Sequence, residues 1–68
     1  MVVYSVREVD SFGQVLADRQ ITGENCQSVL RDLRSVTQGT ERIEVYNAEG
    51  EKAGAIGVEY WRQRLRRR

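Results

Sequence analysis

The sequence predicts an α+β fold with the element order ββαββ, in which a four-stranded antiparallel sheet carries one helix packed on one face. Three observations predict it: alternating β-branched segments toward both ends of the chain, a turn sequence within each of these regions, and one apolar stripe of helical period between them. With 68 residues, 40% hydrophobic and 31% charged, the chain has the composition of one folded domain and no room for a second core. We expect a single domain over residues 1–61 and a basic, flexible tail over 62–68.

The first hairpin is expected over residues 2–21. Residues 2–9 are rich in valine and alternate between two faces, which is typical of a strand. A turn cluster at 10–13 ends in Gly13, and an extended pattern resumes over 14–21. Residues 15–19 are also compatible with a helix by propensity, but Thr22 and Gly23 argue against its continuation. Two antiparallel strands are the simplest interpretation.

The central helix has the clearest pattern in the chain. Its apolar positions recur at helical spacing, at Cys26, Val29, Leu30, Leu33 and Val36. Thr22 is a suitable N-cap for a helix that begins near Gly23, and Gly39 suits a left-handed cap at its end. The spacing therefore predicts one helix of about four turns.

The second hairpin is expected over residues 42–60. Residues 42–46 alternate, so that Ile43 and Val45 face the helix while Glu44 and Tyr46 face away. Residues 47–50 form a tight-turn sequence, after which 52–60 return as an antiparallel strand.

Within this last strand, Ile56, Val58 and Tyr60 are expected on one face. The small residues at 53–55 and at 57 indicate either a close backbone approach or a bulge. Both alternatives are compatible with the sequence.

The charge of the chain is unevenly distributed. Five of its eleven basic residues lie in the last seven positions, as Arg62, Arg64, Arg66, Arg67 and Arg68. The other six basic residues and the ten acidic ones give residues 1–61 a net charge of −4, against +5 for the tail. Such asymmetry is typical of an interaction tail.

The tail has more than one interpretation. Arginine forms bidentate bonds to phosphate and stacks on bases, so the five arginines beside Trp61 predict non-specific contact with nucleic acid. A solvated end that binds nothing, or that docks on the acidic body of a neighbouring copy, is the alternative. Residues 60–65 either extend the last strand or form a short helix, since Trp61 and Leu65 are four residues apart.

No catalytic or metal-binding pattern is found. Cys26 has no histidine to act as its base, since the chain contains none, and the apolar stripe explains it as a buried packing residue. The carboxylate pairs Glu49 with Glu51 and Glu41 with Glu44 are expected at the solvated surface, without the burial that tunes acid–base catalysts. The glycine-rich segment 50–57 lacks the ending of a phosphate-binding loop. We therefore predict no enzyme activity, no metal and no cofactor.

Two functions remain as hypotheses for a small, non-enzymatic binding module. The first is association with nucleic acid through the arginine tail. The second is a protein-interaction or inhibitor domain that acts through its sheet, with Tyr46, Tyr60 and Trp61 as anchors, of which Tyr46 and Trp61 are expected to be exposed. A homodimer is compatible with both, because so small a core supplies little stability. The single cysteine and the short apolar stretches predict a cytoplasmic protein without a membrane partner.

Overall fold

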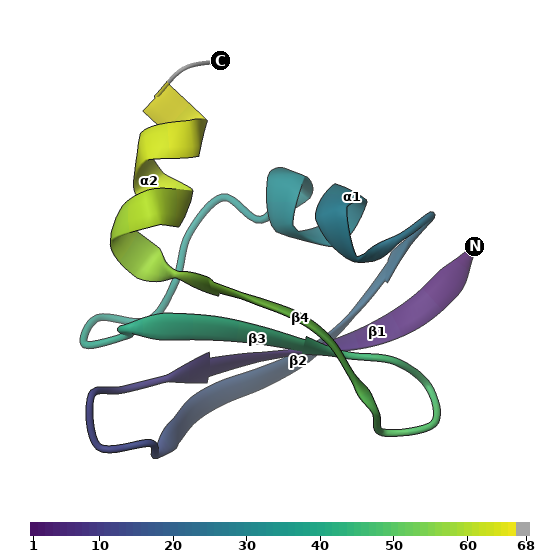
Figure 1. The fold of residues 1–68 in the computed structure, drawn as a ribbon, viewed down its shortest axis with the longest axis horizontal. Coiled ribbons are helices and arrows are strands. Elements are labelled where there is room, and N and C mark those ends of the chain that lie inside the picture. Colours follow the sequence, from purple (N-terminus) through teal and green to yellow (C-terminus); the bar gives the residue numbers. More distant parts are fainter. Residues whose placement is uncertain (67–68) are drawn as a thin grey trace.

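The computed structural model describes residues 1–66 and contains one sheet and two helices. The elements follow the order β1 (Val2–Val9), β2 (Val15–Gly23), α1 (Cys26–Asp32), β3 (Arg42–Tyr46), β4 (Lys52–Gly57) and α2 (Val58–Arg66). The sheet is antiparallel with the strand order β2-β1-β3-β4, and both helices lie on the same side of it (Figure 1). The α+β class and the four-stranded antiparallel sheet are confirmed. The predicted order ββαββ with one helix is incomplete, because a second helix ends the described chain.

The first hairpin forms as expected. Strand β1 pairs with β2 from Val2 opposite Gly23 to Val9 opposite Val15. The turn is closed by Asp10, whose Oδ1 accepts the backbone N–H groups of Phe12 and Gln14 at 2.9 Å each. Gly13 takes a φ of 83°, the conformation for which glycine is suited.

Helix α1 is shorter than the apolar pattern predicts. It begins after Asn25, whose side chain accepts the N–H of Ser28 at 2.8 Å, and it ends before Leu33, which is extended. Leu33 is nevertheless buried and Val36 packs against the core, so the second half of the predicted stripe covers the sheet from a loop. The prediction of a four-turn helix capped by Gly39 was therefore wrong. Apolar spacing indicates which residues are buried, and an extended segment whose side chains are buried at the same spacing gives the same sequence pattern.

The small residues of β4 form both a bulge and a close backbone approach, the two alternatives that the sequence left open. Its register against β3 shifts between Val45 and Tyr46, which leaves Ala53 as the extra residue of a bulge. Beyond the bulge, a Cβ placed on Gly54 would lie 2.6 Å from the Sγ of Cys26. A larger residue at Gly54 would therefore separate α1 from the sheet.

The last predicted strand ends early and becomes α2. Val58 begins this helix and its N–H donates to the carbonyl of Glu41 at 2.9 Å, so the strand face predicted for Val58 and Tyr60 was wrong. Val58 and Trp61 are buried and Leu65 is partly buried, which gives α2 an inward face at helical spacing. Of the two alternatives for residues 60–65, the helix is confirmed.

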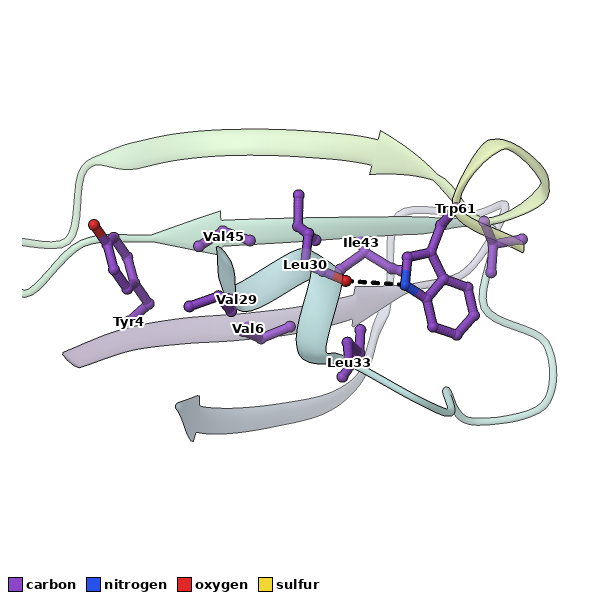
Figure 2. Close-up of a cluster of buried hydrophobic side chains, with 9 residues drawn as sticks. Tyr4, Val6, Val29, Leu30, Leu33, Ile43, Val45 and Trp61 are labelled. Atoms are coloured by element: carbon purple, nitrogen blue, oxygen red, sulfur yellow. Dashed lines mark hydrogen bonds between the residues drawn. The ribbon is translucent and has the colours of Figure 1, made fainter. Parts of the chain in front are cut away.

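The core lies between the sheet and the two helices. It contains Tyr4, Val6, Val29, Leu30, Leu33, Ile43, Val45, Val58 and Trp61. Figure 2 shows that Trp61 reaches across to α1, where its indole N–H donates to the carbonyl of Leu30 at 3.2 Å. This bond satisfies the one polar atom of a buried ring and joins the two helices.

Candidate functional site

Three of the five arginines of the predicted tail, Arg62, Arg64 and Arg66, are carried by α2, which distributes them over two flanks of one helix. Tyr60 and Arg64 line a groove that α2 forms with α1 and β4. Arg62 is bonded to Glu59 at 3.4 Å, and Arg66 follows four residues after Arg62 on the same flank. Arg67 and Arg68 lie outside the described residues.

The groove is lined mainly by small residues of β4 and by Cys26, Gln27 and Leu30 of α1. Ala53, Gly54, Ala55 and Gly57 contribute to it, and none of them carries a charge. Tyr60, with 61% of its surface exposed, stands at its α2 side. Arg31 of α1 and Arg64 of α2 also line one smaller pocket between the helices. The structure thus brings together two arginines that are distant in the sequence, which no sequence pattern indicated.

The basic residues of the sheet are neutralised by carboxylates of the same sheet. Arg7 pairs with Asp18 at 3.3 Å, and Arg19 pairs with the fully buried Glu8. Arg42 and Lys52 both bond to one oxygen of Glu44, at 2.8 and 3.4 Å. Within residues 1–66, by contrast, Arg64 and Arg66 of α2 form no ion pair.

Glu44 is at the centre of the network on the face that the helices leave open. The hydroxyl of Tyr46 donates to it at 2.8 Å and, together with Arg42 and Lys52, lowers the pKa of Glu44 against the opposing effect of burial. The guanidinium of Arg7 lies over the Tyr46 ring, 4.3 Å from its centre. Tyr46 is therefore half-buried and engaged at both its ring and its hydroxyl, rather than exposed as predicted.

Trp61 occupies a different place from the one expected of a binding residue. Only 4% of its surface is exposed, and its single donor is bonded to Leu30. The exposure predicted for Trp61 was wrong, because the chain turns into a helix at Val58 and directs this ring into the core. Of the three aromatic anchors proposed from the sequence, only Tyr60 presents most of its surface.

Cys26 packs against the core as predicted, but it is only partly buried. Its sulfur lies against Gly54, and burial raises the pKa of its thiol, which disfavours the reactive thiolate. Among the described residues, no three side chains of the metal-binding types come together. The same part of the chain holds no helix that is both long and apolar enough to cross a membrane.

Two buried carboxylates were not identified from the sequence: Glu44, expected at the solvated surface, is 7% exposed, and Glu8 is 0% exposed. Glu8 is fully buried under the loop that follows α1, where it accepts the backbone N–H of Thr37 and pairs with Arg19. Burial alone would raise the pKa of Glu8, but these bonds outweigh it and lower the pKa. The burial of Glu8 could have been predicted from its position in β1. It follows Val6 by two residues, so both side chains lie on the face of the strand that is turned toward the helices.

Comparison of the chain with protein-family models, with curated proteins and with solved structures finds no match.

Proposed function

We propose that this protein is a small non-enzymatic binding module that associates with nucleic acid through the arginines of its C-terminal segment, Arg62, Arg64, Arg66, Arg67 and Arg68. One observation carries the proposal: in the described residues the sheet cations are bonded to sheet carboxylates, whereas Arg64 and Arg66 have no acidic partner. A polyanion that approaches α2 therefore displaces no existing ion pair at these two positions.

The expected mode is non-specific binding to the phosphate backbone. Phosphate contacts by arginine release counterions and supply affinity without reading sequence. Five neutralised phosphates correspond to a slope of about −4 in log K against log salt on the B-DNA relation. Trp61 takes no part in this revised proposal, because its ring lies in the core. The single unpaired cysteine, Cys26, supports a reducing, cytoplasmic location.

The test compares two variants that remove the same number of charges. Arg64→Gln with Arg66→Gln alters α2, and Arg42→Gln with Lys52→Gln alters the open sheet face. We expect the first to weaken binding of a labelled single-stranded oligonucleotide by about tenfold at low salt and to reduce the salt slope by about 2, since each lost phosphate contact lowers the slope by about 1. Fluorescence anisotropy at a series of salt concentrations measures both quantities. Equal weakening by the two variants, or no binding by the unaltered chain at low salt, would contradict the proposal.

A second candidate function is binding of a protein through the groove beside β4. Tyr60 supports it, because this aromatic ring is largely exposed next to the uncharged part of β4 that follows Lys52. This candidate differs from the sequence-based version in using the groove instead of the open sheet face, where Tyr46 is already engaged.

A further inference from the structure

Strand β4 forms one edge of the sheet, and its outer side pairs with no other strand in the described chain. Alternate backbone N–H and C=O groups of an edge strand point away from the sheet, where they can pair with another strand. In Figure 1 neither helix passes in front of this edge, since α1 and α2 stand above the sheet and leave the side of β4 open. The free edge is a pairing site that exists in the folded chain.

The two edges of the sheet differ in how they are protected. At the other edge, β2 carries the charged pair Asp18 and Arg19, both held in ion pairs with β1. After its bulge, β4 continues through Gly54–Gly57 in regular register and without a charged residue. Charged residues and bulges at an edge discourage pairing with another chain. Lys52 and the bulge protect the beginning of β4, so its unprotected part is the stretch Gly54–Gly57.

We propose that β4 pairs with β4 of a second copy of this chain, antiparallel about a two-fold axis, to form one continuous eight-stranded sheet. A two-fold axis that relates antiparallel neighbours is perpendicular to the sheet, so the helices of both copies lie on the same face. A core this small supplies little stability by itself, so added burial at the edge is effective in stabilising the fold.

Charge complementarity favours a second copy over an unrelated peptide. Antiparallel pairing places the end of β4 from which α2 rises beside the beginning of the partner's β4. That beginning follows the 47–51 turn, which carries the exposed Glu49 and Glu51. The basic groove side of α2, with Arg64, therefore meets an acidic segment of the same chain.

Tyr60 supplies an apolar contact in the same arrangement. It stands on the groove side of α2 and is largely exposed in the single chain. The facing strand has only Ala53, Gly54 and Ala55 after Lys52, which leaves room for an aromatic ring above it. The small residues of β4 thus leave room for the Tyr60 ring of the second copy, in addition to the room that Gly54 leaves for the sulfur of Cys26.

The first experiment uses the unaltered full chain over a concentration series. Sedimentation equilibrium is expected to give a monomer–dimer transition with twice the chain mass as its endpoint. Hydrogen exchange measured over the same range is expected to show the outward amides within 53–57 becoming protected as the dimer forms, with no change in the outward amides of β2. A chain that stays monomeric up to millimolar concentration would overturn the proposal, as would a dimer that protects β2 instead.

A pair of lysine variants then locates the interface. Ala55→Lys places like charges close together on either side of the two-fold axis and is expected to weaken the dimer by about tenfold or more. The control, Gln20→Lys, makes the same charge change at an exposed position of the opposite edge strand, on the same face, and is expected to leave the dimer unchanged. Equal weakening by both variants would overturn the assignment to β4.

A charge exchange tests the contact expected between Arg64 and the 47–51 turn of the second copy. Arg64→Glu is expected to weaken the dimer, and combining it with Glu49→Lys and Glu51→Lys is expected to restore most of the lost affinity. Ala55→Lys removes none of the arginines of α2, so it is expected to bind an oligonucleotide as a monomer. Because Arg64 belongs to both proposals, Ala55→Lys is the variant that distinguishes them. Loss of the dimer with oligonucleotide binding retained would support pairing through β4, whether or not the arginines bind nucleic acid, and a dimer that persists in Ala55→Lys would contradict it.

Discussion

Glu8 and Glu44 are buried carboxylates on neighbouring strands, and they lie on opposite faces of the same sheet. Glu8 faces the helices and is fully buried, whereas Glu44 faces away from them and is 7% exposed. Glu8 is bonded to the loop that follows α1, at Thr37, 29 positions along the chain. Glu44 bonds only to side chains of its own strand and of β4. The covered carboxylate therefore holds a loop in place, and the open one holds neighbouring side chains together.

The largest effect is expected from removing the covered carboxylate. Glu8→Ala leaves the N–H of Thr37 and the guanidinium of Arg19 without their partner beneath the loop, and we expect it to lower the free energy of unfolding by about 3 kcal/mol. Urea denaturation followed by circular dichroism measures the change. The control is Asp18→Ala, which removes an exposed ion pair from the next strand and is expected to cost less than about 1 kcal/mol. Similar losses of unfolding free energy in both variants would contradict the expectation that the covered carboxylate contributes more to stability than an exposed ion pair.

A smaller effect is expected on the open face. Glu44→Gln keeps an acceptor for the hydroxyl of Tyr46 but loses the charge that Arg42 and Lys52 share, so we expect a loss of about 1 kcal/mol in the same denaturation assay. A loss as large as that of Glu8→Ala would show that the bonds of Glu44 on the open face stabilise the fold as much as the bond between Glu8 and Thr37.

The smallest effect concerns the pH dependence of stability. Both carboxyls have a folded pKa below their ordinary value of 4.5, so the unfolded chain binds protons more readily in this range. The stabilisation is present above the unfolded pKa and is lost as pH falls through the folded pKa. We expect Glu8→Gln to flatten the decline of stability below pH 4.5, compared with the unaltered chain. An unchanged acid decline, measured by urea denaturation at several pH values, would show that Glu8 contributes nothing to it.

The strands were predictable because their signal is local. Residues 2–9 are rich in β-branched side chains and residues 42–46 alternate between polar and apolar ones, and the structure forms strands over the same residues. The turns around Gly13 and Gly50 also agree, since both glycines take the positive φ that tight turns require. Alternation and turn chemistry depend on neighbouring residues and are therefore visible without tertiary information.

The helical regions were harder to predict because packing decides them. Leu33 and Val36 continue the apolar spacing of α1 but contact the core from a loop. Val58 is β-branched and continued the strand pattern, yet it begins α2 where its N–H meets the carbonyl of Glu41. Burial of Trp61 follows from that change of direction, and so does the helical setting of the arginines. The clustering of Arg62, Arg64 and Arg66 was readable from the sequence, whereas their division between two flanks of a helix was not.

The bond between the indole of Trp61 and the carbonyl of Leu30 has a spectroscopic consequence. Trp61 is the single tryptophan of the chain, and it lies where α2, α1 and the sheet meet. Its emission therefore reports the closure of α2 over the core and not contact of a ligand with the outer surface of that helix. A red shift on warming or in urea would record the separation of the two helices. An added external fluorophore is the appropriate probe for measuring what the arginines bind.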